Sequence, residues 1–282
     1  MILIALTCTK KDFLTYEERL ETSFKNFISF FGVEIFFLIV FQGDEENCFD
    51  ASKTFLGSIP SEFYSFQKVP YCSVSRARNY AIKYSRENKF EYLIFHDSSL
   101  VYTRTYICWL KSHLNGDLLA TNYIFTESRD FESDRSVGKA VSFDDFSDIF
   151  VCSYAFPMNK NFPCFDERFG PGNNSIYNSG EDFLFIRSFF KLNSDSRNYL
   201  RFDGVGILHP PRPKDYSKHL AYAEGQGKIH QIYLLEEKSL YALWRCFLFF
   251  GNSFIRLVFF KKNSLRILFL RLKGFFSNRV KV

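Results

Sequence analysis

Three apolar runs that each end in a polar turn constrain the fold of this chain more than any other feature. They cover residues 2–6, 34–41 and 92–95. Stretches with helical spacing lie between them, at residues 14–31 and 75–84. An alternation of strand and helix predicts an α/β fold in which crossover helices join the strands of a parallel sheet.

The polar turns after these runs are expected to meet at one edge, because ligands bind parallel sheets beyond the C-terminal ends of the strands. The turns are residues 7–11, 42–44 and 96–99. Asp97, in the last of them, places a carboxylate at a strand end. It is either a solvated turn residue or a ligand for a divalent cation that is held against a substrate diphosphate.

The later part of the chain predicts further strands with less regular connections. Apolar stretches at residues 118–125, 150–158 and 204–208 have the composition of strands. Residues 127–148 are rich in Ser, Asp and Arg, which predicts a loop. Residues 165–180 are rich in Gly and Asn and are expected to be irregular.

Glu181 and Asp182 form a second acidic feature. They follow the glycine turn at Gly180 and begin a stretch that predicts a helix over residues 182–190. Acidic residues are common in a first helical turn because they complement the helix dipole. A carboxylate pair in this place also suits the abstraction of a proton. Together with Asp97, the pair indicates group transfer from an activated phosphate ester.

Arg76, Arg78 and Asn79 lie at the start of a predicted helix, with Ser73 or Ser75 as its expected N-cap. Backbone N–H groups at a helix start favour phosphate, and arginine adds bidentate hydrogen bonds. These residues are therefore candidates for binding a phosphate, and the alternative is an exposed helical face.

His209 ends a predicted strand and precedes two prolines. It is either a structural residue or, if it faces the cleft, a metal ligand beside Asp97. Residues 222–227 hold two glycines in three residues, which suggests a flexible loop that closes over phosphates. Neither Gly-x-x-x-x-Gly-Lys nor Gly-x-Gly-x-x-Gly occurs in the chain, and this excludes P-loop and Rossmann dinucleotide sites.

Composition narrows the class of protein further. The seven cysteines are scattered, with no Cys-x-x-Cys pair, which predicts reduced thiols in a cytosolic protein and no zinc site. The apolar N-terminus is short and lacks a preceding basic region, so we expect a first strand there and no signal peptide. No uncharged apolar run approaches the ~20 residues that a membrane-spanning helix requires.

The tail from Ser239 onward concentrates the positive charge. It holds nine of the 36 Lys and Arg residues and none of the 31 Asp and Glu residues, interleaved with bulky apolar side chains. A basic amphipathic helix with aromatic residues is typical of an anionic membrane surface. The alternative is a pair of helices packed on the domain, and nucleic-acid binding is disfavoured because no recognisable module accompanies the charge. We expect a domain at residues 1–238 and a membrane-apposed tail at residues 239–282.

Several short motifs follow one another in a set order. They are Thr7-Cys8-Thr9-Lys10, Ala77-Arg78-Asn79, Asp97-Ser98-Ser99, Phe165-Asp166-Glu167-Arg168-Phe169-Gly170-Pro171-Gly172, Gly180-Glu181-Asp182, His209-Pro210 and Tyr222-Ala223-Glu224-Gly225-Gln226-Gly227. In this order they resemble the family 2 glycosyltransferases of the GT-A fold, especially bacterial enzymes of surface-polysaccharide assembly. The resemblance covers residues 1–227 and implies a Rossmann-like, mostly parallel sheet flanked by helices, followed by the helical basic and aromatic tail.

The resemblance implies an inverting transferase that moves a sugar from a nucleotide-diphosphate sugar to a hydroxyl of a lipid-linked glycan, in the cytoplasm at the inner face of the cell membrane. Asp182 would be the general base, and Glu181 would bind or position the acceptor. The implied donor-binding residues are Thr7, Gln42, Asp44, Arg76, Arg78, Asn79 and Asp97. The implied acceptor-binding residues are Phe169, Gly170 and Gly172, and Asp97 and His209 would hold Mn²⁺ or Mg²⁺.

Two departures from the family pattern bear on the donor site. Ser99 stands where the family has its second metal-binding aspartate. Phe41 stands near the place of an acidic residue that contacts the nucleotide, and Gln42 and Asp44 are the neighbouring candidates for that role. Losing a carboxylate is expected to weaken a Mg²⁺ site. The alternatives are a nucleotidyltransferase on a similar scaffold and a non-catalytic, membrane-apposed subunit that binds a sugar nucleotide.

Overall fold

The computed structural model describes most of the chain, over residues 1–43, 59–129, 138–140, 150–159, 161–193, 199–211 and 217–278. The predicted donor-site residue Asp44 lies outside these stretches. Residues 130–137 and 141–148 of the predicted polar loop lie outside them too.

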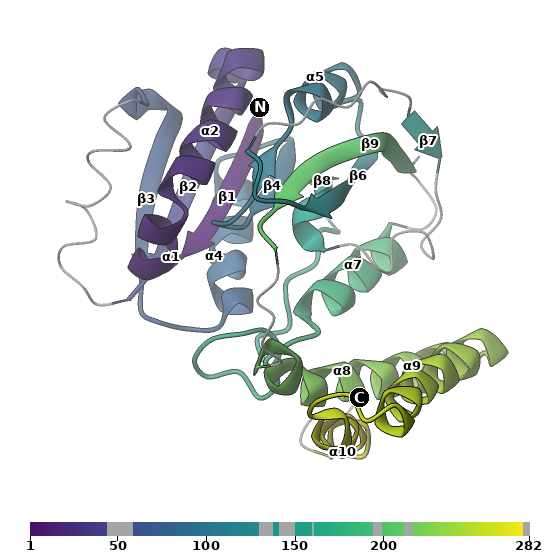
Figure 1. Ribbon diagram of the computed structural model, residues 1–282. Coiled ribbons are helices and arrows are strands. Elements are labelled where there is room, and N and C mark those ends of the chain that lie inside the picture. The colour runs from purple at the N-terminus through teal and green to yellow at the C-terminus, as the bar shows by residue number, and fades with distance from the viewer. Residues whose placement is uncertain are drawn as a thin grey trace.

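A mixed sheet forms the centre of the described fold (Figure 1). One half of it is parallel, in the order β3-β2-β1-β4. Its strands are β1 (Ile2–Cys8), β2 (Ile35–Gln42), β3 (Tyr64–Val69) and β4 (Tyr92–His96). Three of them are the predicted strands, whereas β3 escaped prediction because its sequence is half polar. Leu6 of β1 lies opposite His96, the last residue of β4, so both strands point to the same edge.

The other half of the sheet contains antiparallel pairs. Its strands are β5 (Val101–Tyr102), β6 (Leu118–Phe125), β7 (Gly138–Ala140), β8 (Tyr154–Pro157) and β9 (Tyr199–His209). β8 runs antiparallel to β4 and β6, and β9 runs parallel to β6 and antiparallel to β5 and β7. The predicted strand at residues 150–158 is shorter in the structure because a 3₁₀ turn occupies Val151–Ser153.

The helices alternate with strands along the first part of the chain and follow one another at its end. They are α1 (Lys10–Thr15), α2 (Glu17–Phe31), α4 (Val74–Glu87), α5 (Arg104–Ser112), α7 (Glu181–Leu192), α8 (Ser217–Glu237), α9 (Leu240–Val258) and α10 (Ser264–Phe275). The predicted helix over residues 14–31 is divided at Tyr16, which caps both α1 and α2. Ser73 is the N-cap of α4, and its Oγ accepts a hydrogen bond from the Arg76 N–H.

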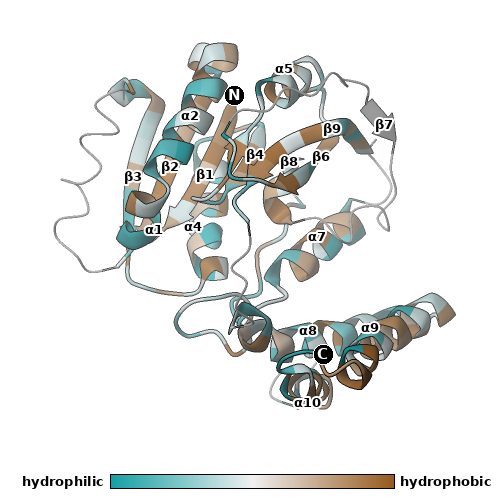
Figure 2. Cartoon of the chain, viewed as in Figure 1, coloured by the Kyte–Doolittle hydropathy of each residue, from teal (hydrophilic) through white to brown (hydrophobic). Residues whose placement is uncertain are grey.

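Two apolar layers cover the sheet, one on each face, and Figure 2 shows β1 and β2 largely in the brown of hydrophobic residues. Successive side chains of a strand point to opposite faces. In β1, Ile4 therefore packs in one layer with Phe24 of α2 and Tyr106 of α5. Ala5 packs in the other layer with Ala81 of α4 and Phe189 of α7.

The last three helices pack together beside α7 (Figure 1). The predicted flexible loop at residues 222–227 is wrong, because these residues form part of α8. Their glycines serve close packing: a Cβ at Gly227 would lie under 3.0 Å from the Arg271 carbonyl oxygen of α10. In the reverse direction, a Cβ at Gly274 would come equally close to the Glu224 carbonyl oxygen of α8. The two glycines thus allow the backbones of α8 and α10 to touch.

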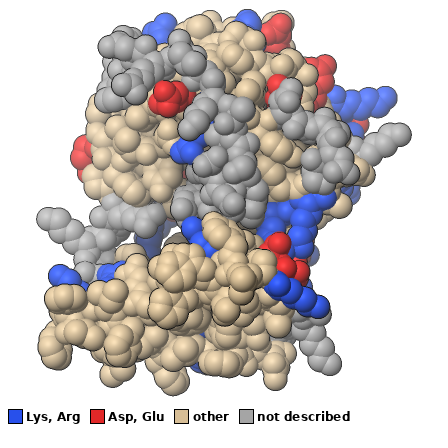
Figure 3. Space-filling model, turned by 90° about the vertical axis from the view of Figure 1, so that its right-hand side faces the viewer, with Lys and Arg blue, Asp and Glu red and all other residues tan. Residues whose placement is uncertain are grey.

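The last two helices, α9 and α10, together carry an apolar stripe that the rest of the described protein leaves exposed. The stripe contains Leu240, Leu243, Phe247, Phe254 and Val258 on α9, and Leu265, Phe269, Leu272 and Phe276 at α10. Figure 3 shows that a broad surface of uncharged residues covers this end of the molecule. Exposed Lys261, Lys262, Arg266 and Lys273 belong to the same segment. Among the described residues, no helix combines the length and the hydropathy needed to cross a bilayer.

Candidate active site

Asp97 lies in a turn whose backbone is held by a buried histidine. The Nδ1 atom of His96 lies 2.7 Å from the Asp97 carbonyl oxygen, and its Nε2 atom lies 2.8 Å from Ser23 Oγ. Ser23 Oγ in turn accepts a hydrogen bond from the Tyr102 N–H at 3.2 Å. A neutral imidazole that donates from Nδ1 and accepts at Nε2 satisfies this network. Burial lowers the pKa of His96 to about 4, so the ring stays neutral while the Asp97 side chain is exposed.

Arg78 of α4 contacts the acidic pair, Glu181 and Asp182, which lies far from it in the sequence. Its Nη1 atom donates a hydrogen bond to Asp182 Oδ1 at 2.6 Å and lies 4.0 Å from Glu181 Oε1. The guanidinium lies over the rings of Phe95 and Phe165, with centroid distances of 5.9 and 5.3 Å. Arg78 was predicted to bind a donor phosphate, but in this structure its charge is directed at the acidic pair.

Asp97 also acts electrostatically on Arg78. Burial by itself would lower the pKa of the Arg78 guanidinium. Asp182, Glu181 and Asp97 together outweigh burial and raise that pKa. Three acidic side chains, one just after β4 and two at the start of α7, therefore act on one buried cation.

The two carboxyl groups of the acidic pair have different surroundings. Asp182 Oδ1 binds Arg78, and its Oδ2 accepts a hydrogen bond from the Val151 N–H at 3.2 Å. Burial, with a further contribution from Asp182, raises the pKa of Glu181 to about 8, although Arg78 opposes this rise. The raised pKa favours the protonated form of Glu181 at neutral pH, next to an Asp182 side chain that is paired with Arg78.

A loop of residues 169–172 lies on the start of α4. The Val74 N–H donates to the Pro171 carbonyl oxygen at 2.8 Å, and Ser75 Oγ donates to the Phe169 carbonyl oxygen at 2.5 Å. The predicted phosphate site at this helix start therefore gains no support from the Val74 amide, which the loop already occupies.

The glycines of this loop are required by its geometry. Gly170 and Gly172 have φ values of 109° and 112°, which side chains with a Cβ rarely adopt. A Cβ at Gly172 would lie under 3.0 Å from the Cys72 carbonyl oxygen. A Cβ at Gly170 would meet Ser75 Oγ and approach Glu181 Cγ. The loop thus passes directly beside the acidic pair.

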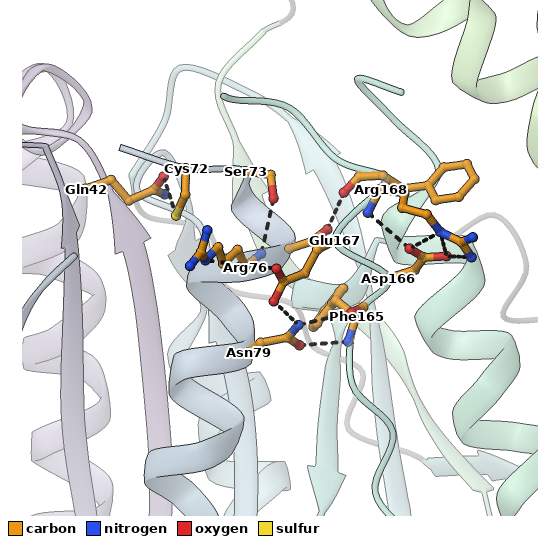
Figure 4. Close-up of polar contacts among 11 residues, drawn as sticks. Gln42, Cys72, Ser73, Arg76, Asn79, Phe165, Asp166, Glu167 and Arg168 are labelled. Atoms are coloured by element: carbon orange, nitrogen blue, oxygen red, sulfur yellow. Dashed lines mark hydrogen bonds and ion pairs between the residues drawn. The ribbon is translucent and has the colours of Figure 1, made fainter. Parts of the chain in front are cut away.

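Arg76 and Asn79 point toward Glu167 (Figure 4), whereas Arg78 is directed at Asp182, because successive helical residues are rotated by about 100°. Asn79 Nδ2 donates to the Phe165 carbonyl oxygen at 3.0 Å and to Glu167 Oε1 at 3.1 Å, and its Oδ1 accepts from the Phe165 N–H. Arg76 is exposed and lies 4.0 Å from Glu167. Asn79 therefore anchors the segment that leads into the glycine loop.

Thr7 and Gln42 end β1 and β2 at the edge that carries Asp97. Gln42 is largely buried, and its Oε1 accepts a weak hydrogen bond from Cys72 Sγ at 3.8 Å (Figure 4). Thr7 is half-buried, opposite Val40 of β2. Both residues are thus placed where the sequence predicted a donor site.

Phe169 belongs to a small core rather than to a surface. Its ring has no exposed area and stacks on Tyr177 with a centroid distance of 5.0 Å. Ile232 of α8 completes this cluster. The predicted acceptor site therefore has only the backbone of the glycine loop, at Gly170 and Gly172, to contact an acceptor in this structure.

Arg187 fixes α7, which carries the acidic pair, to α8. Its guanidinium forms ion pairs with Glu236 and Glu237, and it lies over the Tyr233 ring at 5.5 Å. At the other end of α7, a Cβ at Gly180 would collide with Ile229 of α8. The position of the acidic pair thus depends on contacts with α8 both at the start of α7 and near its middle.

Arg19 is a site residue that no sequence pattern indicated. It lies on α2 and is only 6% exposed. Its Nε atom donates to the Ser99 carbonyl oxygen at 2.7 Å, and its Nη2 atom donates to the Leu208 carbonyl oxygen at 2.8 Å. A single arginine in an amphipathic helix has the pattern of a surface residue, so only the fold shows that this one is buried at the strand ends.

The side chains at this site suit a divalent cation only if a substrate supplies further oxygen ligands. Asp97 supplies one exposed carboxylate, and the His209 ring is held with its Nδ1 2.6 Å from the Pro210 carbonyl oxygen. Within the described ranges, no group of three or more His, Cys, Asp or Glu side chains is arranged to hold a metal ion. Mg²⁺ is commonly bound by one or two carboxylates plus substrate phosphates, and the residues present fit that mode.

Comparisons with known proteins support the assignment of the fold but assign no family. No protein-family model matches the chain, and no curated protein matches it by sequence. The structure is similar to that of the mannosyltransferase PcManGT from Pyrobaculum calidifontis in complex with GDP-Man and Mn²⁺, with a TM-score of 0.56 and 10% identity over 99% of this chain and 88% of the other. It is also similar to GalNAc-T7 with UDP, GalNAc and Mn²⁺, with a TM-score of 0.51 and 8% identity over 84% of this chain and 49% of the other.

These likenesses define the class of fold. The chain has an α/β fold of the GT-A type, in which helices flank a twisted sheet that is parallel in its first half. The fold class predicted from the sequence is therefore confirmed. At 8 to 10% sequence identity the likeness concerns the fold alone, and the function depends on the residues of the site.

Proposed function

We propose that this protein is an inverting glycosyltransferase that moves a sugar from a nucleotide-diphosphate sugar to a hydroxyl group. The observation that carries the proposal is that Asp182 and Glu181 contact Arg78 while Asp97, at the C-terminal edge of the parallel strands, acts electrostatically on the same guanidinium. The neighbouring structures, which were determined with GDP-Man or UDP and with Mn²⁺, support a sugar nucleotide as the donor.

Asp182 is the proposed general base. Arg78 and the Val151 N–H each donate a hydrogen bond to one of its two oxygens and so fix the orientation of the side chain. It takes the proton of the acceptor hydroxyl as the oxygen attacks the anomeric carbon, and the bond from that carbon to the diphosphate breaks. The transition state has oxocarbenium character, as in glycoside hydrolysis. Glu181, in its protonated form, positions the acceptor by donating a hydrogen bond.

Asp97, with His209 as a second candidate, would hold Mn²⁺ or Mg²⁺ on the diphosphate. The cation, when bound, would stabilise the charge of the leaving nucleotide. The site residues serve the donor in further ways: Thr7 and Gln42 line the strand ends, and Arg76 supplies an exposed positive charge at the start of α4. Asn79 contributes by anchoring the neighbouring segment.

The acceptor is proposed to be a lipid-linked glycan of surface-polysaccharide synthesis, met at the inner face of the cell membrane. The support is the exposed apolar stripe of α9 and α10 together with its basic residues, which include Lys261, Lys262 and Arg266. Apolar side chains beside cations are typical of helices that lie on anionic lipid. The backbone of Gly170 and Gly172 would contact the acceptor next to the acidic pair.

The proposal is tested by measuring donor binding and sugar transfer. Nucleotide sugars are screened by thermal shift with and without Mn²⁺, and transfer from the labelled donor that binds is followed with lipid-linked acceptors. In Asp182→Asn, turnover is expected to fall by about 100-fold or more while the donor still binds. Asp203→Asn, an exposed site on β9, is the matched control and keeps wild-type turnover. Undiminished transfer by a folded Asp182→Asn variant would refute the base assignment.

The same assay separates the alternatives. A non-catalytic subunit binds a sugar nucleotide but neither hydrolyses it nor transfers its sugar. A nucleotidyltransferase releases pyrophosphate from a nucleoside triphosphate in the presence of a sugar phosphate. Either result would replace the proposed function.

A further inference from the structure

The guanidinium of Arg19 connects strand ends that come from distant parts of the chain. The Ser99 and Leu208 carbonyl oxygens that it binds are 80 and 189 residues away from it in sequence. Its Nη1 atom donates to two further carbonyl oxygens after β6, those of Glu127 at 3.4 Å and Ser128 at 3.3 Å. One side chain on α2 thus holds the ends of β4, β6 and β9 together.

These contacts fall directly next to the candidate donor residues. Ser99 is in the same turn as Asp97, whose carbonyl oxygen also closes that turn by accepting from the Leu100 N–H. Leu208 immediately precedes His209, and it is also paired with Val101 of β5. The turn of Asp97 and the strand end of His209 therefore meet at the guanidinium of Arg19.

The chemistry at this point requires arginine. The planar guanidinium presents five N–H donors in a fixed fork, whereas a lysine ammonium is a point charge without fixed directions. In Arg19 the Nε, Nη1 and Nη2 atoms each bind a carbonyl oxygen from a different segment. Burial, followed by the charge of Arg129, lowers the pKa of Arg19. Burying this cation at the strand ends costs free energy. An apolar side chain in its place would leave several carbonyl groups without a hydrogen-bond donor.

We propose that Arg19 is a positioning residue that fixes the turn of Asp97 against the strand end of His209 and so shapes the place where a nucleotide diphosphate binds. Its effect on binding rests on the proposed function, whereas its effect on the two strand ends does not. Arg19 acts through the backbone of these segments and does not itself contact the donor.

The test compares Arg19→Met and Arg19→Lys in the full chain with the wild-type protein. Phe31→Leu is the matched control, because Phe31 is a buried residue at the other end of the same helix, and its ring contacts Phe27 and Lys111. The first readout is amide hydrogen exchange at residues 97–101 and 207–209. The second is the affinity for UDP and GDP in the presence and absence of Mn²⁺, measured by calorimetry.

Arg19→Met is expected to speed exchange in both segments by tenfold or more and to weaken nucleotide binding with Mn²⁺ by a similar factor. Arg19→Lys is expected to restore part of the protection, and Phe31→Leu is expected to lower thermal stability without a selective change in either segment. Equal exchange and equal affinity in Arg19→Met and Phe31→Leu would overturn the proposal. If the wild-type protein binds neither nucleotide, the proposed function fails, and the exchange experiment alone decides whether Arg19 holds the two strand ends. If Arg19→Met does not fold, the same comparison is made with Arg19→Lys.

Discussion

Arg78 Nη1 donates a hydrogen bond to Asp182 Oδ1 at 2.6 Å, and this contact joins α4 to the first turn of α7 across 104 residues of sequence. The pair is largely buried, and Glu181 lies 4.0 Å from the same Nη1 atom. Because the rings of Phe95 and Phe165 flank the guanidinium, the cation cannot move far without losing them. This contact therefore fixes the start of α7, which carries the acidic pair, against α4.

Replacing Arg78 by methionine is expected to destabilise the protein strongly. Removing one partner of a buried ion pair leaves an uncompensated charge, which typically costs about 3–5 kcal/mol. The free energy of unfolding, measured by urea denaturation at pH 7, checks the loss. Arg76→Met is the control, since Arg76 is exposed and its ion pair with Glu167 spans 4.0 Å. Equal stability of the two variants would contradict the structure around Arg78.

Glu181 is expected to make stability depend on pH. Its pKa is raised by burial from 4.5 to about 8 in the folded protein, so the folded state binds the proton more tightly than the unfolded state between these values. Stability is therefore fully present below pH 4.5 and is lost as the pH rises towards 8. Glu181→Gln removes this loss, which is on the order of a few kcal/mol.

The measurement for Glu181 is the free energy of unfolding at pH 5, 6.5 and 8. Relative to the wild type, Glu181→Gln is expected to gain stability as the pH rises. A difference between the two proteins that stays constant across this range would show that Glu181 is ionised throughout.

Substituting alanine for Gly227 is expected to disrupt the packing of α8 on α10. The new Cβ would lie under 3.0 Å from the Arg271 carbonyl oxygen, a backbone atom that cannot rotate away. We expect a loss of about 1–3 kcal/mol, as in overpacked cores. Gly251→Ala is the matched control, because Gly251 is also helical and a Cβ there meets nothing within 4 Å. That control gains about 0.5–1 kcal/mol from helix propensity, and thermal denaturation distinguishes the two variants.

Replacing Phe247 and Phe269 by glutamate is expected to weaken binding to anionic vesicles by tenfold or more. The two rings are 65% and 64% exposed, so the fold loses little while the lipid contact loses two apolar groups and gains two negative charges. Co-sedimentation with phosphatidylglycerol vesicles measures the effect. Val33→Glu is the control, since Val33 is 82% exposed and lies outside the tail.

Unchanged vesicle binding by the double variant would refute the membrane proposal. If the wild-type protein is a dimer in solution and the double variant is a monomer, the stripe covers a second copy of the chain instead. Analytical ultracentrifugation without lipid reveals that outcome.

The sequence by itself determined several of the strands and helices and the acidic positions at their ends. β1, β2, β4, α4 and α7 were predictable because continuous apolar runs, period-3.6 patterns and an N-cap serine are local features. The placement of Asp97 after a strand and of Glu181 in a first helical turn follows from the same local patterns.

Only the tertiary structure decided what these residues contact. Arg78 pairs with Asp182, Phe169 packs in a core with Tyr177, and Gly227 lies where α8 contacts α10. The carbonyl groups that Arg19 binds also follow only from the tertiary structure. The reason is physical: hydrogen bonds and packing between segments 80 to 189 residues apart depend on how the whole chain folds, and no local pattern of residues encodes them.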